Sequence, residues 1–86
     1  MKEFLSQCIE EVERARQLFP HPKHLLHALT EESGEVTKAV LNLYNDKDGA
    51  TINDVKEELV QLVAMAIRLY EEGDPMLNLP AIKSNQ

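Results

Sequence analysis

The sequence predicts an all-α protein, a small helical bundle of three main helices that is completed by oligomerisation. Apolar residues recur every three to four positions in three long segments, which is the spacing of one helix face. No segment has the alternation of β-branched and aromatic residues that strands need. A chain of 86 residues buries only roughly 60% of the surface of its unfolded form. We therefore expect one domain, residues 1–86, that forms a homodimer or homotetramer.

The first predicted helix covers residues 3–19. Its apolar stripe comprises Leu5, Cys8, Ile9, Val12, Ala15 and Phe19. Pro20 and Pro22 end the stripe, because proline lacks an N–H donor and clashes with the preceding turn. Arg16 lies on the same stripe, which makes it a candidate to bind a phosphate or a nucleobase. An arginine that snorkels from a helix end or an interface explains the position equally well.

The second predicted helix covers residues 23–44 and follows a turn at the sequence HPKH. Its stripe comprises Leu25, Ala28, Leu29, Val36, Ala39, Val40 and Leu43. A polar segment containing Gly49 ends it. Gly34 lies inside this helix, where it costs about 1 kcal/mol relative to alanine. Either something approaches the backbone closely at Gly34, or the glycine is simply tolerated.

The third predicted helix covers residues 53–72. Thr51 and Asn53 are both candidate N-caps, and Gly73 ends the helix. Its buried face comprises Val55, Leu59, Leu62, Ala66, Leu69 and Tyr70. The remaining tail, residues 75–86, is too short for an independent element, so we expect it to be weakly structured or to form an intersubunit contact.

Charge and composition exclude several classes of partner. Lysine and arginine total 9 against 15 aspartates and glutamates, which gives a net charge of -6 and opposes binding to a nucleic-acid polymer. No apolar run approaches the ~20 residues that span a bilayer, so no membrane partner is expected. The N-terminal sequence lacks the apolar core of a signal peptide, and the single cysteine, Cys8, excludes an internal disulfide. These features predict a cytoplasmic protein.

Glutamates stand where apolar residues are expected on two of the helices. At about 100° per residue, Glu32 falls near the centre of the second stripe and Glu35 on its flank. Glu58 lies on the flank of the third stripe, with Gln61 further out at the edge. A buried carboxylate must be protonated, hydrogen-bonded or metal-bound, and ligation by oxygen alone points to magnesium or manganese. The alternative is a solvated run of charge, which the central position of Glu32 disfavours.

The segments HALTEESGEVTKAV and VKEELVQLVAMAIRLYEEGD together resemble the MazG-like all-α nucleoside triphosphate pyrophosphatases. The family signature is E-E-x-x-E followed some way on by E-x-x-D. The first half is present as Glu31, Glu32 and Glu35. The second half supplies Glu58, but Gln61 stands where the family pattern has aspartate.

The resemblance implies an enzyme that hydrolyses a nucleoside triphosphate to the monophosphate and pyrophosphate with magnesium, in a dimer or tetramer. Glu32, Glu35 and Glu58 would hold the metal, and Glu31 would orient the attacking water or support the ligands. Gln61 offers only a neutral carbonyl oxygen, so the site should bind metal more weakly. Two alternatives remain open. One is a catalytically reduced relative that binds nucleotide or metal, and the other is a plain helical oligomerisation module.

A second candidate metal site lies at the start of the second predicted helix. His24, His27 and Glu31 share a helix face at i, i+3 and i+7, which a transition metal could use. Exposed histidines at a helix start are far commoner than ligands. We therefore expect no metal at these histidines.

Overall fold

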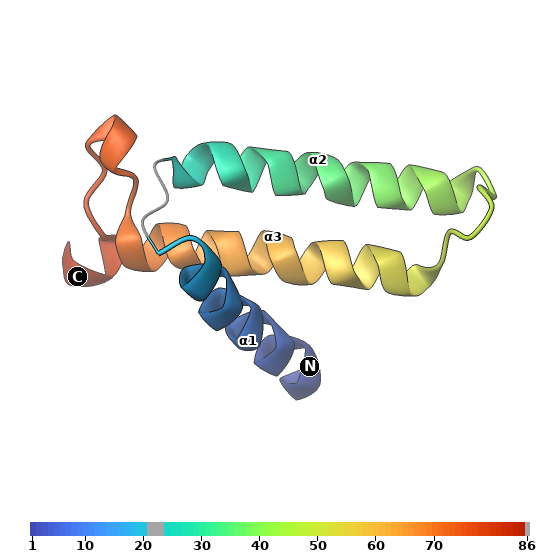
Figure 1. Cartoon of the computed structure of the whole chain (residues 1–86), viewed down its shortest axis with the longest axis horizontal. Coiled ribbons are helices and arrows are strands. Elements are labelled where there is room, and N and C mark those ends of the chain that lie inside the picture. The colour runs from blue at the N-terminus through green and yellow to red at the C-terminus, as the bar shows by residue number, and fades with distance from the viewer. Residues whose placement is uncertain (21–23, 86) are drawn as a thin grey trace.

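The computed structural model describes residues 1–20 and 24–85, and within them it contains three α-helices and two short 3₁₀ turns. These elements are α1 (Lys2–Leu18), α2 (Leu25–Tyr44), α3 (Ile52–Glu72), η1 (Pro75–Leu77) and η2 (Ile82–Asn85). Figure 1 shows α2 and α3 side by side and antiparallel, while α1 packs obliquely against α3 and carries its N-terminal end away from the other helices. The described residues form no strand, so the predicted all-α fold is confirmed.

The helix boundaries follow the sequence signals closely. The first and third helices begin and end within one residue of the predicted ranges 3–19 and 53–72. Residue 23, the predicted start of the second helix, lies outside the described residues, as does most of the predicted HPKH turn. Helix α2 begins at Leu25.

A capping box starts α3 and settles which of the two candidate residues caps it. The Thr51 hydroxyl accepts a hydrogen bond from Asp54 N–H at 3.2 Å, and Thr51 N–H donates to the Asp54 carboxylate at 2.8 Å. These reciprocal bonds satisfy two N–H groups that a helix start otherwise leaves unpaired. Thr51 is therefore the N-cap, and Asn53 lies inside the helix.

Helix α2 has no cap of its own and is capped instead by Asp74, which follows α3. The Asp74 carboxylate is fully buried and accepts hydrogen bonds from Leu26 N–H at 3.0 Å and Met76 N–H at 3.1 Å. It also contacts His24 Nδ1 at 2.9 Å. Burial alone raises the pKa of this carboxyl, but the bonds from Leu26 and His24 outweigh that effect and hold its pKa below the ordinary value. Asp74 therefore joins the start of α2 to the end of α3 as an anion.

The turn between α3 and the tail requires glycine. Gly73 has φ of 72°, and a Cβ there would collide with the carbonyl oxygen of Leu79 and the backbone of Pro80. The close approach lets Asp74 and Leu79 exchange two backbone hydrogen bonds, at 2.9 and 3.0 Å. The tail, expected to be weakly structured or to form an intersubunit contact, folds back as the short turns η1 and η2, and Lys83 Nζ reaches Glu71 at 3.3 Å. Its contact with another subunit stays a prediction.

The apolar core of the single chain is small. The buried apolar residues among those described are Cys8, Val12, Ala15, Leu25 and Ala64. The predicted stripe of α1 is buried only along its middle, because among the described elements α1 packs against α3 alone: Leu5, Ile9 and Phe19 stay 47%, 58% and 65% exposed. Val40 on α2 and Ala66 and Tyr70 on α3 were likewise predicted to be buried and are exposed.

The chain is more open than a compact domain of its size. Its radius of gyration is 14.2 Å, whereas a compact chain of this length has about 12 Å. Its accessible surface is 6241 Å², against about 5,200 Å² for a typical folded monomer of this mass.

Among the described helices, none is both long and apolar enough to cross a membrane.

Candidate functional site

A buried arginine fixes the end of α1 against α3. Arg68 is 1% exposed and donates from Nε and Nη2 to the two carboxylate oxygens of Glu72, at 2.7 and 2.9 Å. Its Nη2 also donates to the carbonyl oxygen of Phe19 at 3.0 Å, which satisfies one of the last backbone acceptors of α1. The bonds from Arg68 hold the pKa of the Glu72 carboxyl below its ordinary value. The sequence analysis did not single out Arg68, although its glutamate partner four positions later was a visible signal.

Arg16, the predicted phosphate- or base-binding residue, belongs to this same cluster. Its Nη2 donates to Glu71 at 2.5 Å and its Nε to Glu72 at 3.1 Å. The bond to Glu71 and the weaker one to Glu72 raise the pKa of Arg16 despite partial burial. The structure therefore does not bring Arg16 into the cavity described next, and its role with substrate stays a prediction.

A cavity of about 370 Å³ lies among the three helices and contains part of the predicted site. One part of its lining carries carboxylate and amide oxygens, from Glu11, Glu31, Glu32 and Gln61. Another part is apolar, from Ala15, Phe19, Leu25, Ala28 and Met65. Its remaining lining residues are His24, Arg14 and Arg68. The lining of the cavity therefore combines carboxylates with apolar side chains that suit a flat organic ring.

Two glutamates on facing helices each bury a carboxylate oxygen that no described residue bonds. These oxygens are Oε2 of Glu32 on α2 and Oε2 of Glu58 on α3. Burial raises the pKa of Glu32 above its ordinary value of 4.5, and the charges of Glu58 and Glu35 raise it further. A buried oxygen without a donor costs free energy, and nearby negative charge increases the cost. The negative charge of the Glu32–Glu58 pair is therefore not compensated by a positive partner at these two oxygens.

The other predicted ligands surround this pair less closely. Glu35 is exposed on α2, although its charge acts on Glu32. Gln61 is half-buried and lines the cavity. Within residues 1–20 and 24–85, no three acidic, histidine or cysteine side chains come together as a ready-made metal cluster. Of the three predicted glutamate ligands, Glu32 and Glu58 thus lie on facing helices and Glu35 is exposed, and the metal site stays a prediction.

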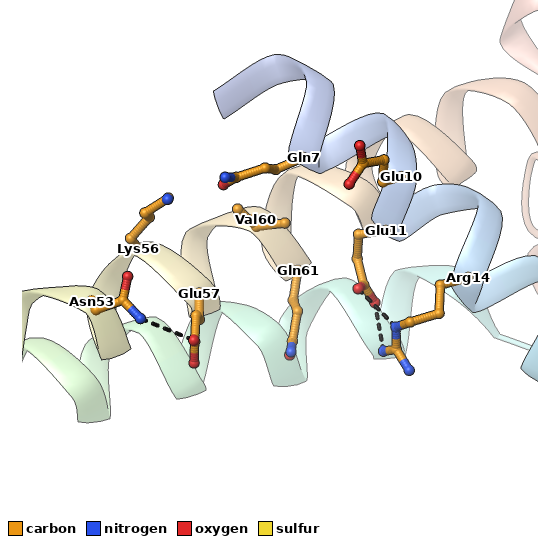
Figure 2. A pocket seen from close by; sticks show the side chains of 9 residues that line it. All are labelled: Gln7, Glu10, Glu11, Arg14, Asn53, Lys56, Glu57, Val60 and Gln61. Atoms are coloured by element: carbon orange, nitrogen blue, oxygen red, sulfur yellow. Dashed lines mark hydrogen bonds and ion pairs between the residues drawn. The ribbon is translucent and has the colours of Figure 1, made fainter. Parts of the chain in front are cut away.

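Glu11 on α1 is a further carboxylate near the pair, which the sequence analysis missed. Its charge also raises the pKa of Glu32. Figure 2 shows Glu11 holding Arg14 through two hydrogen bonds, at 2.9 and 2.7 Å, on the wall of a second, polar cavity of about 490 Å³ between α1 and α3. Glu11, Arg14 and Gln61 line both cavities, so the two adjoin. The available signal was the position of Glu11, three residues after Cys8 and four before Ala15 on the buried side of α1.

The candidate catalytic residue Glu31 is exposed and pairs with His27 Nε2 at 2.8 Å, whereas His24 turns to Asp74. The two imidazole rings lie 5.7 Å apart. Of the set His24, His27 and Glu31, the structure thus brings His27 and Glu31 into contact, and His24 has a different carboxylate partner.

Comparison with protein-family models, with curated proteins and with solved structures gives no match. The assignment of the site depends on its own chemistry. Two facing carboxylates with unpaired buried oxygens suit a hard divalent cation, and the adjoining cavities have room for a small anionic ligand bound through that cation.

Proposed function

We propose that this protein is a magnesium-dependent nucleotide pyrophosphohydrolase, which converts a nucleoside triphosphate and water to the monophosphate and pyrophosphate. The observation that carries the proposal is the Glu32–Glu58 pair, with its two unpaired buried oxygens. An ordinary helix interface would place apolar residues there, since unpaired buried carboxylates are costly. A divalent cation satisfies both oxygens and removes their mutual repulsion. The E-E-x-x-E pattern and the adjoining cavities favour a nucleotide as the ligand that this cation recruits.

Each residue of the site has a distinct role in this proposal. Glu32, Glu35 and Glu58 would hold the cation, and Gln61 would add a neutral carbonyl oxygen. Magnesium, when bound, would neutralise charge on the triphosphate and make a water more acidic. Glu31 would orient the attacking water or support the ligands. The weak donor Gln61 makes the site depend more on substrate phosphates for its remaining ligands.

We further propose that the protein forms a homodimer or homotetramer in the cytoplasm. The accessible surface of the chain exceeds that of a typical monomer of its mass by about 1,000 Å². That excess is comparable to the roughly 800 Å² that each partner buries in a standard interface. Exposed apolar residues such as Leu41 and Tyr44 on α2 and Ile52 on α3 supply the surface. A second copy packed on them would complete the bundle.

One alternative is a catalytically reduced relative that binds nucleotide or metal without turnover. The observation in its favour is Gln61, which lines the site with one charge fewer than the family pattern has. The other alternative is a plain helical oligomerisation module, which the exposed apolar surface favours but the Glu32–Glu58 pair does not.

A pyrophosphate-release screen tests the proposal. Wild-type protein is incubated with common and modified nucleoside triphosphates and magnesium, and then with manganese. We expect release from at least one nucleotide, loss of that release in Glu32→Gln, and unchanged release in Glu13→Gln, which alters an exposed glutamate on α1. If no nucleotide releases pyrophosphate with either metal but magnesium still stabilises the fold, the catalytically reduced relative is favoured. If magnesium does not stabilise the fold either, the oligomerisation module is favoured.

A further inference from the structure

His24 is held in one orientation by a buried carboxylate. The Asp74 carboxylate, which is fully buried, meets His24 Nδ1 at 2.9 Å. An ionised carboxylate only accepts hydrogen bonds, so Nδ1 carries the hydrogen whether the imidazole is neutral or charged. The low pKa of Asp74 keeps that acceptor ionised. In the neutral ring, Nε2 is consequently an acceptor with a lone pair.

The ring that Asp74 orients lines the 370 Å³ cavity. No residue of the described part of the chain hydrogen-bonds His24 Nε2, and the His24 side chain keeps 39% of its surface exposed. Proteins use a buried carboxylate in this way to fix one imidazole nitrogen and present the other nitrogen to a ligand. A histidine needed only to cap the fold would not have to line the cavity.

The surroundings of His24 match a flat ring better than a phosphate. Leu25 and Ala28 adjoin it on α2, and Phe19 at the end of α1 lines the same cavity. Arg68 fixes the position of Phe19 through its carbonyl oxygen. Glu32 lies eight positions further along α2, about 12 Å at the rise of an α-helix. A nucleotide whose phosphates reach a cation at Glu32 has a length that places its base near His24.

We propose that His24 binds the base of the nucleotide, with neutral Nε2 accepting a hydrogen bond from an N–H group of the base. This inference rests on the proposed function, since it assigns one part of the same ligand. Protonation of His24 converts Nε2 from an acceptor to a donor, which removes the bond. Binding should therefore be weaker at acid pH, where an imidazole is protonated.

Other charged groups face the same cavity and must be separated from His24. Those that line it are Glu11 and Arg14 on α1, Glu31 and Glu32 on α2, and Arg68 on α3. Asp74 and His27 lie beside His24 itself: Asp74 bonds its Nδ1, and the His27 ring lies 5.7 Å away. The raised pKa of the Glu32 carboxyl means that it also takes up a proton closer to neutral pH than an ordinary glutamate does. A variant at His24 itself is needed to assign the pH dependence.

The test measures binding of non-hydrolysable α,β-imido nucleoside triphosphates with magnesium, by calorimetry at pH 8 and pH 6. The key variant is His24→Asn, whose amide can still donate to Asp74 but has no group in the place of Nε2. The best analogue should bind His24→Asn about five- to tenfold more weakly than wild type at pH 8, the value of one hydrogen bond. The drop in affinity between pH 8 and pH 6 should be smaller in His24→Asn. His27→Gln, which changes the neighbouring exposed ring, should retain wild-type affinity at pH 8.

Nitrogen-15 NMR of wild-type protein supplies a test that does not depend on the variant folding. Hydrogen should reside on Nδ1 of His24, and the Nε2 resonance should shift when the analogue binds. Nucleotide binding with an unmoved Nε2 resonance, or with higher affinity at pH 6, would overturn this inference and leave the proposed function standing. If wild type binds no nucleotide at either pH, both proposals fail together.

Discussion

Replacing Glu32 with glutamine should reverse its stability relative to wild type, depending on whether magnesium is present. Without metal, the variant should be the more stable protein, because it removes a charge that is partly buried and repelled by Glu58 and Glu35. With saturating magnesium, wild type should be the more stable, because a cation that binds only the folded state stabilises it. This reversal of relative stability is specific to a carboxylate that binds a cation in the folded state.

The sizes of the two effects follow from simple estimates. Two like charges about 8 Å apart repel by about 1 kcal/mol at an effective dielectric constant of about 40, which lies between the values for a protein surface and for water. Magnesium at 100 times its dissociation constant stabilises the folded state by about 2.7 kcal/mol. In a domain of this size 1 kcal/mol moves the melting temperature by about 4–8 °C. Without metal, Glu32→Gln should therefore melt several degrees above wild type. At saturating magnesium, it should melt below wild type under the same conditions.

The metal-free difference should also depend on pH in a defined direction. The pKa of Glu32 in the folded chain is raised above its ordinary value of 4.5. A raised pKa means that the folded state binds the proton more tightly, so the contribution of Glu32 to stability is full below pH 4.5 and is lost as the pH rises through the raised pKa. Wild type and Glu32→Gln should thus be nearly equal at pH 4 and diverge above it.

Thermal unfolding followed by circular dichroism, at several pH values with and without magnesium, is the appropriate assay. Glu13→Gln, which removes an exposed glutamate, serves as the charge-matched control and should keep the full magnesium shift. If Glu32→Gln also keeps the full shift, the carboxylate pair does not bind the metal. If wild type without metal is the more stable at pH 7, the argument from repulsion and burial is wrong.

Four further outcomes are expected. Gln61→Asp should tighten magnesium binding about tenfold, seen as a lower midpoint when unfolding is titrated with the metal; activity gained only in this variant would identify a decayed enzyme. Light scattering at micromolar concentration should give a mass of at least twice 9.8 kDa, and a clean monomer would contradict the proposed oligomer. Gly73→Ala should lose at least about 2 kcal/mol in urea unfolding, because its backbone is left-handed and a Cβ would meet Leu79 and Pro80. Gly34→Ala should instead gain about 1 kcal/mol, since a Cβ there meets no atom within 4 Å, and a loss would show that a second copy packs on Gly34.

Local signals predicted most of the fold. The three helices follow from apolar periodicity, from Pro20 and from Gly73, all of which act within a few residues. The Thr51–Asp54 capping box is equally local. Exposure was harder to predict, because periodicity shows which face of α1 is apolar but not how much of that face α3 covers. The exposed Leu5 and Ile9 are the consequence.

The candidate site could be predicted only in part, for a related reason. Glu32 and Glu58 interrupt apolar stripes, so each is visible within its own helix. Glu11 acts on Glu32 from α1, and its contribution depends on how α1 crosses α3. Asp74 resembled a residue that simply follows the end of α3, and nothing in its neighbours reveals a bond to Leu26. Long-range partners of this kind follow from packing, which no single helix pattern contains.

The bond from Leu26 N–H to Asp74 has a consequence for the order in which the chain folds. The two residues are 48 positions apart, so a nascent chain has made α2 before the residue that caps it exists. The first turn of α2 should therefore fray until α3 docks, and its amides should exchange with solvent faster than those at the start of α3, which Thr51 caps at once. A chain shortened to residue 72 should keep three helices yet leave that turn permanently frayed. Because His24 directly precedes this turn and the turn leads into Glu31, Asp74 decides when this part of the site is assembled.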